Sequence, residues 1–127
     1  MLTAIITQLK TLSIQTVFAK YDGVIPPKNK PYLYVWEAPS AFSDSVHGTG
    51  GFYVSYHTQV GKQDDISAYL NQQVSPALHK ITLEDDLYSG EYFALEDSNQ
   101  TSILITTNSD GTISKDRLFT IPIIGNY

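Results

Sequence analysis

The stretch Gly50–Leu78 constrains the fold more than any other part of this sequence. Within Phe52–Val60, apolar side chains and Thr58 occupy every second position, which is the period of a β-strand. After Gly61 the apolar residues follow near-helical spacing, and they are Ile66, Tyr69, Leu70, Val74, Ala77 and Leu78. A change of period across a short polar joint predicts a strand that leads directly into a packed helix.

The composition favours one folded domain. A chain of 127 residues with 42% hydrophobic residues is long enough for a single core and too apolar for intrinsic disorder. The absence of cysteine excludes disulfides, thiolate catalysis and cysteine-based zinc sites. We expect a single domain over residues 1–127, in which the proline-rich segment 22–31 and the glycine-ended segment 38–51 are mobile loops.

The charge pattern disfavours nucleic-acid and membrane partners. The formal net charge is −5, and the 8 basic residues are scattered along the chain. A clustered basic surface is the usual footprint of a nucleic-acid or anionic-lipid binder, so we expect neither partner. Residues 1–19 lack a basic start and an apolar run of about 18 residues, so we also expect no signal peptide and no membrane span.

The segments before Gly50 predict one helix and two strands. Leu2–Leu12 places its apolar residues on one helical face and predicts an amphipathic helix. Ile14–Phe18 is β-branched and favours a short strand. Tyr32–Glu37 is apolar on both faces, which is typical of a strand inside a sheet.

The segments after the strand Gly50–Val60 predict a helix, one short candidate strand and two further strands. We expect a helix from about Gln63–Asp65 to Val74, then a short turn that Ser75 caps, with Pro76 at its first position. Glu84–Asp86 and Ser89–Gly90 predict an acidic loop. The remaining expected segments are a short strand Tyr92–Leu95, a strand Thr101–Thr107, a turn Asn108–Gly111, and a strand Arg117–Ile124. Pro122 is expected to restrict the end of that last strand to a sheet edge.

The expected order is therefore α-β-β-β-α-(α)-β-β. The strands form a mainly antiparallel sheet, and the first and second helices pack on it instead of alternating with its strands. This is an α+β fold.

Candidate metal and catalytic residues are few. Asp44 and His47 offer two metal ligands, which is too few for a site. Ser45 is contiguous with them, and contiguity is not the geometry of a catalytic triad. His57 lies on the polar face of its strand with Ser55, and we expect it to face solvent or an interface.

The acidic cluster and the glycines are also weak candidates for chemistry. Glu84, Asp85 and Asp86, with His79 nearby, have oxygen ligands that suit calcium or magnesium, but such clusters are more often solvated. Gly48–Gly51 precede a strand, whereas a phosphate loop needs glycines before a helix. We therefore expect no enzyme, no cofactor, and no catalytic, cofactor-binding or metal-binding residue.

The layout resembles the tail terminator and tail completion (head-tail joining) proteins of long-tailed bacteriophages. The shared features are the helix Leu2–Leu12, a proline-rich joint, the strand Tyr32–Trp36, and the strand Phe52–Val60 leading into the helix Asp65–Val74. A proline soon after that helix and a final apolar strand near residue 124 also fit. The resemblance covers nearly the whole chain, and it supplies no individual binding residue.

The resemblance implies a virion structural protein in the tail or neck, assembled in the host cytoplasm. Such proteins form a ring, commonly a hexamer, that caps the tail tube protein and offers a docking surface for head-tail connector proteins. Two alternatives stay open. One is a small metal- or ligand-binding or catalytic domain using residues 44–47 or 84–86, and the other is a bacterial protein-binding adaptor.

Overall fold

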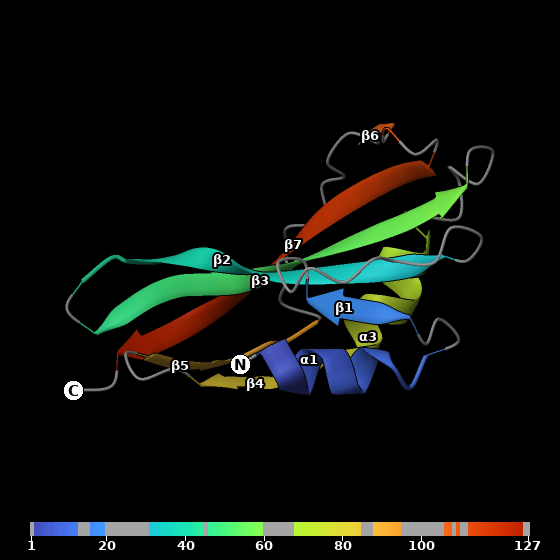
Figure 1. Ribbon diagram of the computed structural model, residues 1–127. Coiled ribbons are helices and arrows are strands. Elements are labelled where there is room, and N and C mark those ends of the chain that lie inside the picture. Colours follow the sequence, from blue (N-terminus) through green and yellow to red (C-terminus); the bar gives the residue numbers. More distant parts are fainter. Residues whose placement is uncertain are drawn as a thin grey trace.

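The computed structural model describes the chain in segments, which are residues 2–12, 16–19, 31–44, 46–59, 68–84, 88–94, 106–107, 109 and 112–125. Within them the structure is a curled mixed sheet that carries short helices, an α+β architecture (Figure 1). The elements in chain order are α1 (Leu2–Leu9), β1 (Val17–Ala19), β2 (Tyr32–Phe42), β3 (His47–Gln59), the π-helix η1 (Leu70–Val74), α3 (Ser75–Ala77), β4 (Thr82–Glu84), β5 (Tyr88–Glu91), β6 (Thr106–Thr107) and β7 (Thr112–Gly125).

The long strands β3 and β7 form the middle of the sheet. The strand order in the described sheet is β1-β2-β3-β7-β5-β4, and β6 also pairs with β7. β1 is parallel to β2, whereas the other described pairs are antiparallel. β3 and β7 pair from His47 opposite Ile124 to Gln59 opposite Thr112 without a register shift. Facing residues of the two strands therefore lie on the same side of the sheet over this whole length.

The predicted unit of strand and helix builds the core. Phe52 and Val54, on the face of β3 predicted to be apolar, are fully buried. Phe52 stacks on Phe119 of β7 with ring centroids 5.1 Å apart, and the Tyr92 ring meets both rings edge-on. The helices and the turn after α3 cover this face with Ile5, Leu9, Leu70, Val74 and Leu78. Full burial of each such side chain contributes about 1.5–3 kcal/mol, so this cluster is the main source of stability in the described structure.

The second helix continues where the sequence analysis placed a break. Residues 68–69 are helical, η1 follows, and α3 begins at Ser75 with helical backbone at Val74 and Ser75. The Ser75 hydroxyl lies 2.7 Å from the Tyr92 hydroxyl, so the prediction that Ser75 caps a new turn is wrong. In a regular α-helix the ring of Pro76 would clash with the carbonyl group four residues earlier, and the wider π-helical turn before Pro76 makes room for this ring. The predicted helix start at residues 63–65 lies outside the described residues.

Residues 38–51 form a β-hairpin instead of the predicted loop. β2 continues to Phe42, and β3 begins at His47. The segment is polar and glycine-rich, and its own pattern therefore gives little strand signal. Pairing with β7 on the far side of β3 supplies the backbone hydrogen bonds that hold it extended. The other predicted loop, residues 22–31, lies outside the described residues.

Predicted strand boundaries change near β1 and β5. β1 is Val17–Ala19, where the sequence analysis placed the strand at Ile14–Phe18. Ser89–Gly90, predicted as loop, lie in β5, whereas residues 92–94 of the predicted strand Tyr92–Leu95 are not in a strand. β5 forms because it pairs with β4 on one side and with β7 on the other, and its partner residues in β7 are distant in sequence.

The last strand confirms one prediction and corrects another. Arg117, Phe119, Ile121 and Ile123 are all buried on one face, as their spacing predicted. Pro122 does not mark an edge, because β7 lies between β3 and β5 in the sheet. Of the predicted strand at residues 101–107, only the part that forms β6 is described.

Candidate interaction surface on the β arm

One end of the sheet extends beyond the helices as an arm. We define the arm as residues 38–51 of the β2–β3 hairpin together with residues 120–125 of β7 and 88–90 of β5. Figure 1 shows this part on the left, with α1 and α3 against the other part of the sheet. The arm therefore presents a surface that is separate from the helix-covered core.

Two backbone irregularities mark the base of the arm. The β2–β3 register changes between Ala38 and Ala41, so that two residues of β2 lie opposite one residue of β3. Such a bulge bends its strand and increases the local twist. Opposite Ala38, Gly51 has a φ of 155°, and a Cβ there would collide with the carbonyl oxygen of Phe119. The bend thus depends on a glycine at position 51.

The tip of the arm is a turn held by Asp44. Its Oδ1 accepts hydrogen bonds from the backbone N–H of Val46 at 2.7 Å and of His47 at 2.6 Å. The Ser43 backbone N–H and hydroxyl donate to the His47 carbonyl oxygen at 2.9 and 3.1 Å. The backbone N–H of His47, and then that of Val46, lower the pKa of the Asp44 carboxyl. Asp44 therefore stays anionic at the tip at neutral pH.

The structure gives the Asp44 and His47 pair a local role in the turn. The Oδ2 of Asp44 lies 3.2 Å from Nδ1 of His47, and both side chains are exposed. The other carboxylate oxygen is engaged by two amide hydrogen bonds, and the described residues include no group of three or more His, Cys, Asp or Glu that could hold a metal. Ser45 lies outside the described residues.

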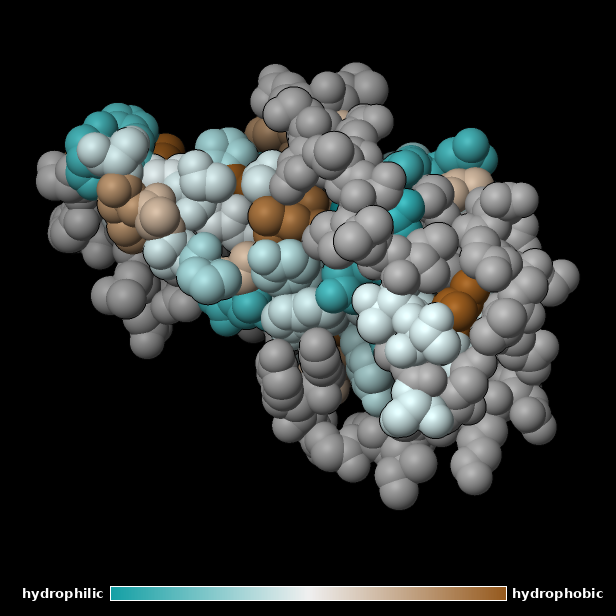
Figure 2. Space-filling view, turned by 90° about the horizontal axis from the view of Figure 1, so that it is seen from above, coloured by the Kyte–Doolittle hydropathy of each residue, from teal (hydrophilic) through white to brown (hydrophobic). Residues whose placement is uncertain are grey.

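Apolar side chains surround the tip. Among the described residues, the large hydrophobic side chains that are exposed are those of Phe42 (41% exposed), Val46 (37%) and Ile124 (54%). We call these three residues the apolar tip. Figure 2 shows hydrophobic residues beside hydrophilic ones at this end of the molecule.

The apolar tip has side chains on both faces of the arm. Phe42 pairs with Gly48, which pairs with the buried Ile123, so Phe42 and Ile123 share a face. A Cβ on Gly48 would lie 2.9 Å from Cδ1 of Phe42, so glycine leaves the room that this ring occupies. Ile124 follows Ile123 and points to the opposite face. A tip that is apolar on two faces suits insertion into a groove better than contact with a flat surface.

His57 lies in an aromatic cluster. Its ring stacks on Tyr32 with centroids 4.6 Å apart and meets Tyr34 edge-on at 5.1 Å. Its Nε2 is 2.9 Å from the hydroxyl of the buried Ser55. His57 is half-buried, and the face predicted to be polar is lined by rings that β2 brings alongside β3.

The acidic cluster does not form a described site. Glu84 is the exposed last residue of β4, and Asp85 and Asp86 lie outside the described residues. His79 is engaged elsewhere, because its Nδ1 accepts a 3.0 Å hydrogen bond from the backbone N–H of Ala94. Its ring also meets that of Phe93 edge-on. Within the described residues, the structure does not bring His79 and Glu84 together in a cation site.

The apolar tip was missed by the sequence analysis. Phe42 and Val46 flank the polar run Ser43–Ser45, a turn-forming composition between apolar residues, and this was the available signal of a hairpin. The sequence predicted Ile124 in a strand, but it could not predict that its side chain is exposed, because exposure depends on which neighbouring segments cover it.

Comparisons with known proteins support the fold only. No family model matches the chain, and no curated protein matches it. One solved structure, which carries no functional name, is similar with a TM-score of 0.53 and 15% identity, over 99% of this chain and 90% of that chain. At this identity the likeness concerns the fold alone. No helix in the described part of the chain is long and apolar enough to span a membrane.

Proposed function

We propose that this protein is a virion structural protein of a long-tailed bacteriophage that acts in tail completion or head-tail joining. The observation that carries the proposal is the arm, which projects beyond the helix-covered core and ends in the apolar tip. A ring requires two different surfaces on each subunit that meet heterologously and close by rotation. An arm that reaches out from the core supplies one of these surfaces.

The size of the tip sets the strength of such a contact. Burial of a Val, Ile or Phe side chain contributes about 1.5–3 kcal/mol, and the three tip side chains are roughly half exposed in the monomer. Covering them in a neighbouring subunit therefore contributes roughly 2–4 kcal/mol per contact. A single contact of this size is weak, since 1 mM affinity already corresponds to about 4 kcal/mol. A closed ring gives each subunit two such contacts, which favours cooperative assembly.

In this proposal the ring, commonly a hexamer in the family that the sequence resembles, caps the tail tube. Its other surface receives the head-tail connector. The protein acts as a structural subunit of the tail or neck, and the proposal assigns it no catalysis. Genes for phage structural proteins on either side of its own gene are the expected genomic setting.

Light scattering after size-exclusion chromatography, with negative-stain images, tests the proposal. We expect concentration-dependent rings that bind the ends of purified tail tubes. Val46→Asp should abolish assembly, because it puts a charge on the apolar tip. Thr49→Asp is the matched control, since Thr49 is exposed on β3, three residues after Val46, and lies outside the apolar tip.

The result against the proposal is a monomer at high concentration that binds no tail tube. If divalent cations also stabilise that monomer strongly, the metal-binding alternative gains support. Equal loss of assembly in both variants would show that the apolar tip is not the contact.

A further inference from the structure

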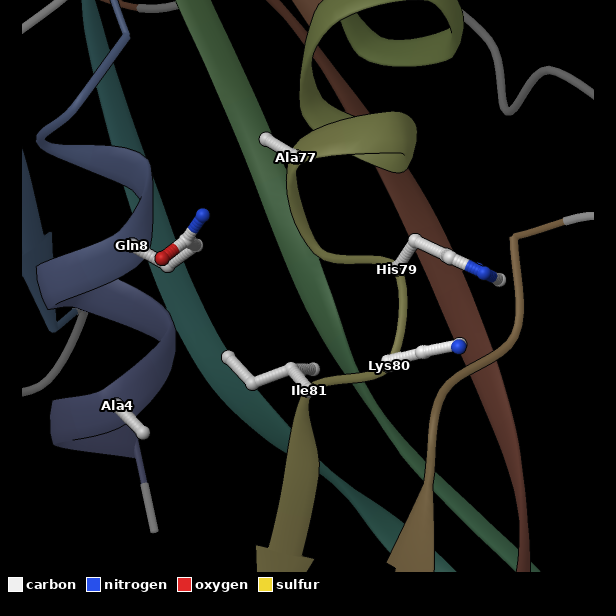
Figure 3. Close-up of a pocket in the computed structure, with 6 residues that line it drawn as sticks. All are labelled: Ala4, Gln8, Ala77, His79, Lys80 and Ile81. Carbon is white, nitrogen blue, oxygen red and sulfur yellow. The ribbon is translucent and has the colours of Figure 1, made fainter.

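A groove lies between α1 and the turn that joins α3 to β4. Its volume is about 310 Å³, and the described residues that line it are Ala4, Gln8, Ala77, His79, Lys80 and Ile81. Figure 3 shows Ala4 and Gln8 on α1, with Ala77 and Ile81 on the other side and the side chains of His79 and Lys80 extending away from α1. Three of the six lining residues are small or apolar (Ala4, Ala77 and Ile81), and three are polar (Gln8, His79 and Lys80). The cationic side chain of Lys80 extends away from α1, at the rim of the groove (Figure 3).

The groove has room for the apolar tip. A buried cavity of about 150 Å³ is enough to hold a benzene molecule, so this groove can take the Phe42 ring together with an aliphatic neighbour. Two alanines on opposite walls leave the space between the elements open. The apolar tip, with side chains on both of its faces, can contact both walls at once.

The charges of the two surfaces are complementary. The tip carries the exposed carboxylate of Asp44, which its turn keeps anionic. None of the six described lining residues of the groove is acidic, although the chain has 13 acidic residues and a net charge of −5. Lys80 is exposed at the rim and can attract the carboxylate of the tip.

The tip and the groove of one molecule lie at different places in the fold. Figure 1 shows the tip at the far end of the arm and α1 and α3 against the helix-covered part of the sheet. A contact between them must therefore join two molecules. Because the two surfaces differ, the contact is heterologous and can build a ring.

We propose that the apolar tip of one subunit inserts into the groove between α1 and the α3–β4 turn of the next copy of this chain. The inference rests on the proposed ring assembly and names the two surfaces that form it. The partner is thus a second copy of the chain, bound through an apolar knob with one charged pair at its rim.

Disulfide trapping tests the contact directly, because the chain has no native cysteine. Two single variants, Val46→Cys and Ala77→Cys, are mixed and oxidised. A disulfide forms only when the two Cα atoms approach to about 4.4–6.8 Å, so we expect a Val46–Ala77 crosslinked dimer by intact mass. Asn71→Cys replaces Ala77→Cys in the control, since Asn71 is exposed on the same helical segment and does not line the groove, and here the product should be lost.

A groove-filling variant gives a second, independent test. Ala4→Trp occupies the groove and should abolish both assembly and the crosslink. Thr3→Trp adds the same ring at an exposed neighbouring residue of α1 and should leave both unchanged. Circular dichroism establishes that each variant is folded.

The outcomes separate this inference from the proposed function. Rings without the Val46–Ala77 crosslink would overturn the inference and leave the ring proposal standing. A Val46–Ala77 crosslink without closed rings would support the contact and count against the ring. A Val46–Val46 crosslink alone would show tip-to-tip pairing and overturn the inference, as would intact rings in Ala4→Trp.

Discussion

Replacing Gly51 by alanine tests whether the arm is held by the backbone of a single residue. Gly51 has a φ of 155°, and conformations of this kind cost a residue with a side chain about 1–3 kcal/mol. The new methyl group would also collide with the carbonyl oxygen of Phe119, which forces β3 and β7 apart at a cost of about 1–3 kcal/mol. We therefore expect Gly51→Ala to lower the free energy of unfolding by about 3 kcal/mol.

Thermal and urea unfolding followed by tryptophan fluorescence measure this change. The single tryptophan, Trp36, stacks on Tyr53 with ring centroids 5.1 Å apart, two positions from the bend. For a domain of this size, about 3 kcal/mol corresponds to a fall in Tm of roughly 10 °C.

The neighbouring Gly50 is the matched control. A Cβ there would lie 3.4 Å from Cγ2 of Ile123 and meet no backbone atom at close range. Gly50→Ala should change stability by less than about 1 kcal/mol. If Gly51→Ala and Gly50→Ala unfold at the same urea concentration as the wild type, the bend does not depend on glycine at position 51.

Three further predictions concern single polar side chains. Asp44→Asn should lower Tm at neutral pH, and the difference from the wild type should disappear in acid. The pKa of Asp44 in the folded protein lies below 3.8, so the carboxylate contributes fully to stability above that pH, and the contribution is lost as pH falls through the folded pKa. Ser75→Ala removes the 2.7 Å hydrogen bond to the Tyr92 hydroxyl and should cost about 1–2 kcal/mol in urea unfolding, but less in a Tyr92→Phe background. Burial lowers the pKa of Lys115 below 10.5, so at alkaline pH the unfolded chain binds this proton more tightly than the folded chain. The free energy of unfolding should therefore rise with pH between the lowered pKa and 10.5. In urea unfolding at alkaline pH, Lys115→Met should not show this rise.

Each of these predictions has a contrary result. An Asp44→Asn difference that persists in strong acid would assign the effect to the geometry of the turn instead of the charge. An equal cost of Ser75→Ala with and without the Tyr92 hydroxyl would show that the two side chains do not interact. If the free energy of unfolding of Lys115→Met still rises with alkaline pH, the rise comes from another group.

The local hydrophobic pattern was sufficient to predict the core. The alternation in Phe52–Val60 placed Phe52 and Val54 on the buried face of a strand, and the near-helical spacing after it placed Leu70 and Val74 on the buried face of a helix. These predictions hold because an element buries the side that is apolar, whichever neighbour covers it. The candidate metal and catalytic residues stay a prediction, and none of the described ones lies in a group of three or more possible ligands.

Only the tertiary structure decided the arm, and with it the proposed contact surfaces. Residues 38–51 carry little strand signal of their own, and they are extended because β7 pairs along the whole of β3. The hydroxyl of Ser75 looked like a helix cap in sequence, but it meets Tyr92, 17 residues away. The sequence by itself determined which faces are apolar. Which apolar residues stay exposed, as Phe42, Val46 and Ile124 do, depends on contacts between segments distant in the chain, and periodicity carries no information about those contacts.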